Sequence, residues 1–468
     1  MTFVPDLPAD GRPIVDAIVG SIASAVESGR LKPGTRLPTH RAMARRLGIS
    51  VGTVTRAYAR AAESRLVTGE VGRGTFVLPP ALRAVEKRYL IPNSSPGTID
   101  FGPNYPLRGP VLEDELLRKT LHELAEDSQA RGLLSARPAE HEVRYREAGE
   151  RWLRRAGLCD CASRIRPTSG FQPAMQSVLR AVARSGEFII AEELCSPSLP
   201  LIASAHGLRL ESVGMDAQGM LPDRLEAAIH RRRGQVRAIF IEPSLHSITV
   251  AHMPEARRRV IAEIARRHDL VIIELDDVFP FLSEPAPLLA SLAPERTILI
   301  ADVCRALGFN LRTAFVLAPD QYLDALEEGI ALVHWIARTL PLEIAVRFAD
   351  SARADELIAW RRDELRRRYE LAKAALGQWP GRGHPMAGHW WIPLPRGWRS
   401  DSFVDAARRQ DVLLYSTSSF ASDPLSIPCG ARVSMAAAAD LESVERGLER
   451  LRDLLRRGPG AAPDRASA

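Results

Sequence analysis

The amino-acid sequence predicts a two-part α/β protein. A small winged helix-turn-helix is followed by a much larger α/β body that ends in a small α+β subdomain. The first observation is the stretch 37–77, where two short helical patterns joined by a glycine turn precede a hairpin pattern. The second is a series of short apolar runs that alternate with helical stretches between residues 100 and 380, as in a mostly parallel sheet. The third is length, because 468 residues, 46% of them hydrophobic, exceed one small module.

The N-terminal part begins with an amphipathic helix over residues 12–29. Thr39 is the expected N-cap of the next helix, Gly48 ends that helix, and Ser50 caps the following one. Four apolar residues of the first helix recur at every fourth position and are expected to pack against the helix pair: Ile14, Ile18, Ile22 and Val26.

The second helix of the pair has two different faces. The outer face carries Thr53, Arg56 and Arg60, a small polar side chain followed by two cations. Such a face fits a DNA major groove, with small side chains at base edges and cations near phosphates. A solvated arginine face on an ordinary helix pair is the alternative explanation. The inner face is expected to hold Val51, Val54, Ala57 and Tyr58.

A predicted hairpin from Leu66 to Val77 carries Arg73 between two glycines, where the side chain can approach a narrow groove. Charge is concentrated in the same region. Residues 1–80 hold eleven Lys/Arg and six acidic residues, so they account for +5 of the net charge of +6. This excess indicates a nucleic-acid partner for the N-terminal part.

Five apolar runs in the body are expected to be strands buried on both faces, and residues 320–378 are expected to be helical. The runs are 188–191, 238–241, 270–273, 297–301 and 314–317. Two proline-rich spots mark a linker before the body. The predicted parts are therefore a head over 1–78, a linker over 79–99, a large domain over 100–380, a small subdomain over 381–458 and a disordered tail over 459–468.

The composition also argues against several classes of protein. Five scattered cysteines do not form a disulfide framework, and Cys159-Asp160-Cys161 lacks the second pair of ligands that a zinc site needs. The sequence has no secretory signal pattern and no apolar run of the ~18 residues that a membrane span requires. A cytoplasmic protein without a structural metal is expected.

The stretch 28–77, SGRLKPGTRLPTHRAMARRLGISVGTVTRAYARAAESRLVTGEVGRGTFV, resembles the winged helix-turn-helix of the GntR family. Position 51, often arginine in that family, is Val51, so one DNA contact is expected to be missing. By this resemblance, six residues lie where the family touches operator DNA: Arg41, Ser50, Thr53, Arg56, Arg73 and Gly74.

Several stretches of the body resemble fold-type I aminotransferases, which carry pyridoxal 5'-phosphate. Residues 168–174, TSGFQPA, resemble the turn that opens a helix over the cofactor phosphate, and they include Ser169 and Gly170. The resemblance of the remaining stretches implies three further positions. They are Asp276 of IIELDDVFPFL at the pyridinium nitrogen, Arg312 of NLR facing the phosphate, and Arg432 of ARVSMA holding a substrate carboxylate.

The departures from that family lie at its reactive centre. The Schiff-base lysine is expected seven residues before Arg312, where this chain has Arg305. A guanidinium stays protonated and cannot form an imine, so neither a covalent cofactor link nor transamination is expected. The chain's four lysines all lie far from this segment in the sequence: Lys32, Lys87, Lys119 and Lys373.

Two interpretations of the altered pocket remain open. Asp276 and Arg305 could form a buried ion pair that fills the cofactor's place, or the pocket could bind a ligand without a covalent bond. His246 and His252 are expected to be ordinary surface residues. Four other positions have drifted from the aminotransferase pattern: Asp302 at a phosphate-binding serine, Ser196 at the ring-stacking tyrosine, Ser247 at the asparagine that meets the ring hydroxyl, and Phe279 at a tyrosine.

A GntR-like head joined to an aminotransferase-like body is the layout of the MocR regulators. The resemblance implies a homodimeric regulator that binds double-stranded operator DNA. Its body would dimerise and sense a small effector, an amino acid or a B6 vitamer, without transamination. Two alternatives remain: a pyridoxal phosphate-dependent aminotransferase with a fused DNA-binding head, and a body that acts only as a dimeriser.

Overall fold

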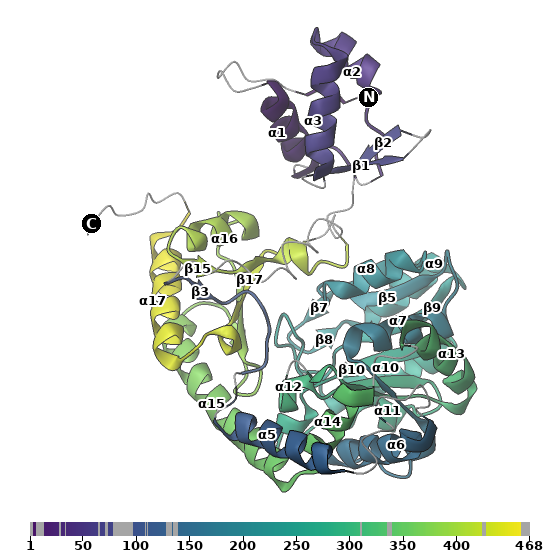
Figure 1. Cartoon of the computed structure of the whole chain (residues 1–468). Coiled ribbons are helices and arrows are strands. Elements are labelled where there is room, and N and C mark those ends of the chain that lie inside the picture. Colours follow the sequence, from purple (N-terminus) through teal and green to yellow (C-terminus); the bar gives the residue numbers. More distant parts are fainter. Residues whose placement is uncertain are drawn as a thin grey trace. The chain divides into compact units, whose positions relative to one another are not determined.

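The computed structural model divides into two units, residues 1–93 and 94–468, which are described separately (Figure 1). The predicted linker lies largely outside the described residues, and so does the predicted tail after residue 459. The structure describes residues 3–5, 14–27, 30–32, 34–63, 66–70, 74–77, 97–107, 109, 111–127, 133, 139–308, 311–334, 339–423 and 427–459.

The described residues of the first unit form three helices and a two-stranded hairpin around one apolar cluster. This confirms the predicted helices and wing, and the hairpin register joins Val67 to Val77. Ile18, Ile22 and Met43 are fully buried in the cluster, but Ile14 is 47% exposed, so its expected inward packing is wrong. The elements are α1 (Ile14–Glu27), α2 (His40–Leu47), α3 (Val51–Glu63), β1 (Val67–Glu70) and β2 (Gly74–Val77).

The second unit is built on a seven-stranded sheet in the order β4-β12-β11-β10-β9-β5-β6. Among these strands β12 runs antiparallel to both of its neighbours, and the other pairs are parallel. All five apolar runs predicted as strands are strands, whereas β4 and β6 were not predicted. The strands are β4 (Ile165–Thr168), β5 (Phe188–Glu192), β6 (Arg209–Val213), β9 (Val236–Ile241), β10 (Val271–Asp276), β11 (Thr297–Asp302) and β12 (Ala314–Leu317).

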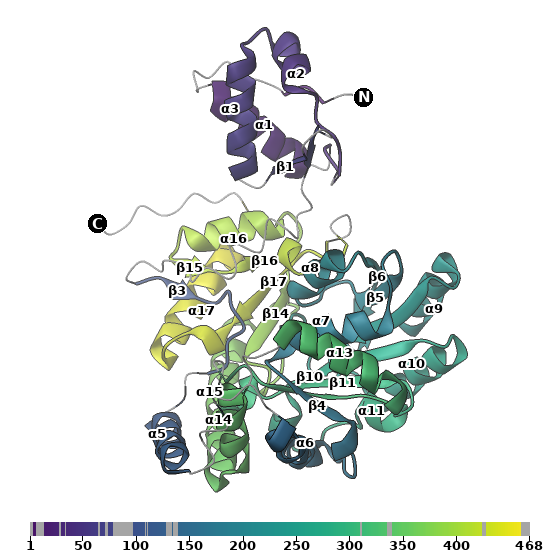
Figure 2. The ribbon, with the colours of Figure 1, turned by 45° about the vertical axis from the view of Figure 1, so that its right-hand side comes forward.

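Helices cover both faces of this sheet (Figure 2). Apolar side chains of α7, α8 and α13 pack on one face, and those of α9, α10 and α11 pack on the other. This two-sided burial explains why the strands read as continuous apolar runs. The helices are α7 (Phe171–Val182), α8 (Ser198–Ala205), α9 (Pro222–Arg232), α10 (Glu255–Arg267), α11 (Leu289–Leu292) and α13 (Leu323–His334).

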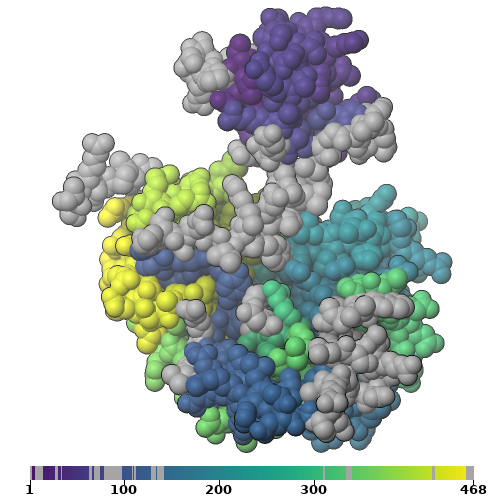
Figure 3. All heavy atoms as spheres, viewed as in Figure 1, coloured from purple at the N-terminus to yellow at the C-terminus, as the bar shows by residue number. Residues whose placement is uncertain are grey.

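Further helices pack around the sheet as an outer group, in which α14 contacts both α5 and α6. Helix α5 lies at the surface of the second unit (Figure 3). The short hairpin β7–β8 joins β6 to α9. These elements are α5 (Val111–Glu126), α6 (Ala139–Leu153), α12 (Cys304–Leu307), α14 (Thr339–Asp350), α15 (Ala352–Leu376), β7 (Met215–Asp216) and β8 (Gly219–Met220).

The C-terminal residues form a second apolar cluster around an antiparallel sheet in the order β13-β14-β17-β16. Strand β3 (Ile99–Asp100), at the start of this unit, pairs in parallel with β15 and adds Ile99 and Phe101 to the same cluster. The other elements are β13 (Arg382–Gly383), β14 (His389–Pro393), α16 (Ser400–Arg408), β15 (Val412–Leu413), β16 (Tyr415–Ser416), β17 (Gly430–Ser434) and α17 (Leu441–Arg457).

Three global features concern membrane spans, thiols and metal ligands. No helix among the described residues is long and apolar enough to cross a membrane. The five cysteines are free thiols. No group of His, Cys, Asp and Glu in the described part of the chain could hold a metal ion.

Candidate functional site

The helix-turn-helix of the head is fixed by local hydrogen bonds at its caps. The Thr39 hydroxyl accepts from the Ala42 N–H at 3.3 Å, and the Ser50 hydroxyl accepts from the Thr53 N–H at 3.1 Å. Gly48 ends α2 with φ of 67°, a conformation that glycine adopts at little cost. These bonds fix where α2 and α3 begin.

The outer face of α3 presents exposed polar and cationic groups. Arg41 and Arg56 are exposed and form no ion pair with another described residue. Arg60, by contrast, pairs with Asp16 of α1 at 2.7 Å. Val51 is 44% exposed at the first turn of α3, so its predicted inward packing is wrong. The first residue of α3 therefore faces outward, and Val54, one turn later, is the first residue of this helix in the apolar cluster.

A further cation, Arg36, lies at the surface of the head, where its backbone pairs with Phe76 of the wing. Gly74 has φ of +121°, and a Cβ there would lie 2.7 Å from the Arg36 Nε atom. The sequence analysis did not single out Arg36, because only the hairpin pairing places it beside the wing. Arg73 lies outside the described residues, so its position at the wing tip stays a prediction.

In the second unit, Asp276 ends β10 and is 1% exposed. Its carboxylate accepts from the Ser244 hydroxyl and from the N–H groups of Val278 and Phe279 at 2.9 and 3.0 Å. Burial raises the pKa of this carboxyl, and these bonds oppose the rise. The carboxylate is therefore held by the chain's own donors.

Arg305 does not pair with Asp276, so the open interpretation of an Asp276–Arg305 ion pair is wrong. Its Nε donates to the Asp277 carboxylate at 2.9 Å and its Nη1 donates to the Ala387 carbonyl at 3.2 Å. Adjacent side chains at a strand end point in different directions, so the neighbouring Asp277 is the acidic group within reach.

Asp302 occupies the N-terminus of α7, where the aminotransferase resemblance places a phosphate. One carboxylate oxygen accepts from the Phe171 N–H at 3.0 Å, and the other accepts from the Cys304 N–H at 2.7 Å. Gly170, with φ of +91°, starts the helix and lies against the Arg312 backbone. A side-chain carboxylate thus takes the helix-terminal N–H that suits an anion.

The predicted carboxylate-binding arginine, Arg432, is also engaged internally. It donates to the Ser247 carbonyl at 3.2 Å and the Gly102 carbonyl at 2.6 Å. Its guanidinium lies 4.5 Å above the Phe420 ring. Burial lowers its pKa to about 10. The Arg432 side chain thus connects β17 to the loop that holds Ser247 and to the backbone at Gly102, near the start of the second unit.

Three further residues of the predicted pocket differ in how deeply they are buried. Phe279 is buried and packs edge-on against Trp152, with ring centroids 6.2 Å apart. Ser169 is half-buried beside the start of α7, and the Arg312 side chain is exposed. The Phe171 N–H at the predicted phosphate position, the Asp276 carboxylate and the Arg432 guanidinium are all hydrogen-bonded to protein atoms.

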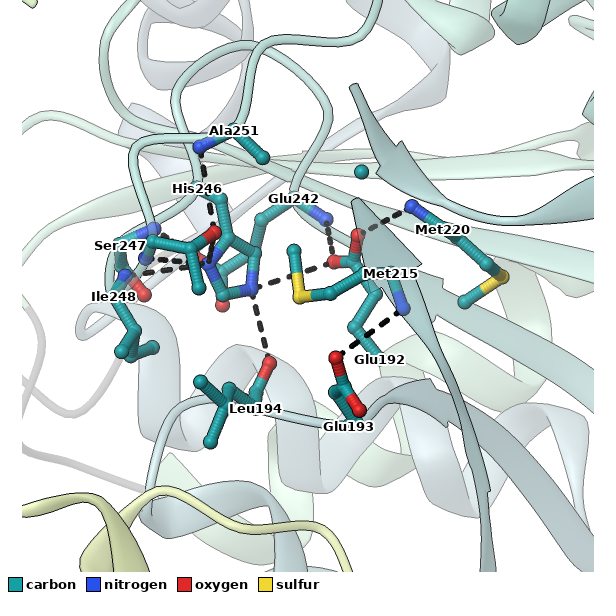
Figure 4. Close-up of polar contacts among 12 residues, drawn as sticks. Glu192, Glu193, Leu194, Met215, Met220, Glu242, His246, Ser247, Ile248 and Ala251 are labelled. Atoms are coloured by element: carbon teal, nitrogen blue, oxygen red, sulfur yellow. Dashed lines mark hydrogen bonds and ion pairs between the residues drawn. The ribbon is translucent and has the colours of Figure 1, made fainter. Parts of the chain in front are cut away.

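A buried polar cluster lies next to this region (Figure 4). Glu192, at the end of β5, accepts from the N–H groups of Met220 and Glu242 at 3.1 and 3.2 Å. His246 Nε2 lies 3.6 Å from the same carboxylate and 2.9 Å from the Leu194 carbonyl. His246 is fully buried, so its expected place at the surface is wrong, whereas His252 is exposed.

Stability is expected to fall as this cluster ionises. Burial, followed by the nearby Glu242, raises the pKa of Glu192 from 4.5 to about 8. The folded state then holds a proton that the unfolded state has lost, so the free energy of unfolding should fall as the pH rises from about 4.5 to about 8. Each unit of pKa shift corresponds to about 1.4 kcal/mol.

Denaturant unfolding between about pH 6 and pH 9 measures this effect. Glu192→Gln should reduce the pH slope, because it removes the titrating group. Glu263→Gln on the exposed face of α10 is the control and should leave the slope unchanged. An identical slope in wild type and Glu192→Gln would contradict the assignment.

Comparison with known proteins agrees with this division of the chain. Residues 14–77 match the family described as bacterial regulatory proteins, gntR family. An uncharacterized HTH-type transcriptional regulator of Bacillus subtilis, YdeF, is 27% identical over 459 residues, which is 97% of each chain. The vitamin B6 salvage pathway transcriptional repressor PtsJ of Salmonella typhimurium is 26% identical over 403 residues, covering 84% of this chain and 88% of PtsJ.

Among solved structures, an archaeal alanine:glyoxylate aminotransferase superposes with a TM-score of 0.71 at 20% identity, covering 81% of this chain and 96% of that enzyme. The head is thus a GntR-type helix-turn-helix domain. The body has the fold of the fold-type I aminotransferases, as the sequence predicted.

Proposed function

We propose that this protein is a MocR-type transcriptional regulator that binds double-stranded operator DNA. The observation that carries the proposal is the winged helix-turn-helix, with Arg41 and Arg56 exposed and free of ion pairs among the described residues. Full-length similarity to named HTH-type regulators supports it. A DNA-binding role also places the protein in the cytoplasm.

The proposed DNA contacts follow from the exposure of the head residues. Ser50, Thr53 and Arg56 lie on the outer side of α3 and would face the major groove. Arg41 would contact phosphate, and Gly74 would let the wing backbone approach the groove with Arg73. The exposed Val51 would meet a thymine methyl group, where an arginine would meet a phosphate or a base edge.

The body is proposed to be a non-catalytic dimerisation module. Arg305 is held by Asp277 and the Ala387 carbonyl, and it cannot act as the Schiff-base residue. Because the Asp302 carboxylate takes the Phe171 N–H at the anion position and Asp276 already accepts three hydrogen bonds from the chain, the residues present do not fit pyridoxal 5'-phosphate. Two such bodies would place two heads on two half-sites of an operator.

Selection of genomic fragments with the full-length protein would test the DNA-binding function. We expect a recovered sequence to bind much more tightly than a shuffled control. The affinity should fall by about 10³- to 10⁵-fold between ~50 and ~200 mM salt, the range for six to ten phosphate contacts. A flat salt response, or equal affinity for the shuffled sequence, would overturn the proposal.

A further inference from the structure

A cavity of about 460 Å³ lies in the second unit beside the segment that joins Arg305 to Arg312, and neither of these residues is among the described residues that line it. It is bounded by α5, by the chain around the end of α12, and by α14 and α15. Most of the residues that line it are apolar, among them Leu117, Leu311, Ile344 and Phe348. This volume and lining are typical of sites that bind small organic molecules.

The polar lining of the cavity is Glu113, Asp114 and Arg361. Arg361 is 1% exposed, and its Nη2 donates to Glu113 Oε2 at 3.0 Å and to the Leu107 carbonyl at 3.4 Å. Its Nη1 donates to the Ala306 carbonyl. Both terminal nitrogens of the Arg361 guanidinium therefore already donate to protein acceptors.

The two carboxylates are less fully engaged. Glu113 Oε1 and the exposed Asp114 carboxylate have no hydrogen bond to another residue in the part of the chain that the structure describes. Among the described residues of the lining, two carboxylates and one guanidinium give a formal charge of −1. A cation attached to an apolar body complements both the charge and the walls, whereas an anion would face two like charges.

We propose that this cavity binds a small organic amine, with its ammonium group at Glu113 and Asp114 and its apolar part against α14. The Arg361–Ala306 hydrogen bond connects the site to the residue that follows Arg305. A ligand that shifts Arg361 would therefore also shift the backbone next to Arg305. Only the role of the amine as an effector rests on the proposed function; its binding does not.

Thermal unfolding of the full-length protein, without DNA, tests the site with three probes of matched shape. We expect 2-phenylethylamine to raise the unfolding temperature, because a ligand that binds only the folded state stabilises it. The neutral 2-phenylethanol and the anionic 3-phenylpropionate should cause smaller shifts or none. Equal shifts with all three probes, or none with the amine, would overturn the proposal.

Two variants locate the binding within the molecule. Asp114→Asn should weaken amine affinity by about two- to fivefold, as for an exposed charge pair, when titrated by calorimetry. Leu340→Trp should abolish binding by filling the cavity mouth, since Leu340 is 40% exposed and lines it. Leu332→Trp is the control, because Leu332 is 67% exposed outside the cavity. Unchanged binding in Leu340→Trp would contradict the site.

The effector role is tested separately from binding. The affinity of the selected operator fragment is measured with and without 2-phenylethylamine, in wild type and in Leu340→Trp. We expect a change in wild type that the variant lacks, because coupling requires the amine to bind one arrangement of the protein better than another. Tight operator binding that is indifferent to the amine would refute the effector role and leave the DNA-binding function intact.

Discussion

Arg56→Ala is expected to lower operator affinity by roughly 5- to 150-fold. The arginine lies exposed on the outer face of α3, where a base or phosphate contact contributes about 1–3 kcal/mol. Fluorescence anisotropy with the selected operator fragment measures the loss. Thermal unfolding should be almost unchanged, because an exposed side chain without an ion pair contributes little to stability.

The matched control for this variant lies one helical turn further along the same helix. Arg60→Ala removes the same charge, but Arg60 is paired with Asp16 at 2.7 Å and points towards α1. Its effect on operator affinity should be clearly smaller than that of Arg56→Ala. Equal losses in both variants would mean that the head binds through overall charge alone and that the proposed recognition face is wrong.

The double variant Asp302→Ser/Arg305→Lys should gain affinity for pyridoxal 5'-phosphate. Replacing Asp302 removes the carboxylate that takes the Phe171 N–H, and two unit charges ~4 Å apart repel by about 4 kcal/mol at an effective dielectric constant of 20. Relief of that repulsion corresponds to an affinity gain of about 10³-fold. Equilibrium dialysis of the full-length variant measures it without reference to activity.

The single variant Arg305→Lys is the informative comparison. It restores the residue type of the aminotransferases but leaves Asp302 at the start of α7, so it should bind the cofactor no better than wild type. Circular dichroism and thermal unfolding would show that both variants remain folded. Strong binding by Arg305→Lys alone would mean that Asp302 does not guard the anion position.

The head could be predicted from sequence because its signals are local. The caps at Thr39 and Ser50, the glycine turn and the hairpin register depend on residues close together in the chain. Val51 was misplaced because helical spacing does not say where the apolar cluster begins. The strands β4 and β6 were missed because their short sequences, IRPT and RLESV, contain polar residues or proline.

The predicted site of the body depends, by contrast, on contacts between residues that are far apart in the sequence. The resemblance read from the sequence implies Arg305 at the lysine position and Asp302 at a phosphate-binding position, since these are questions of residue type. It could not identify their partners. Arg305 bonds to Asp277 and to the Ala387 carbonyl, 82 positions along the chain. Such pairs depend on how distant loops meet at the ends of strands.

The sequence by itself therefore determined that this chain has a GntR-type head and an aminotransferase-like body, and the resemblance implies Arg305 at the position of the reactive lysine. The tertiary structure decided the partners of the predicted site residues: Asp302 accepts from the Phe171 N–H at the start of α7, and Arg432 donates to backbone carbonyls. The physical reason is that a buried charge must find a partner, and only the folded arrangement settles which partner lies within hydrogen-bond distance.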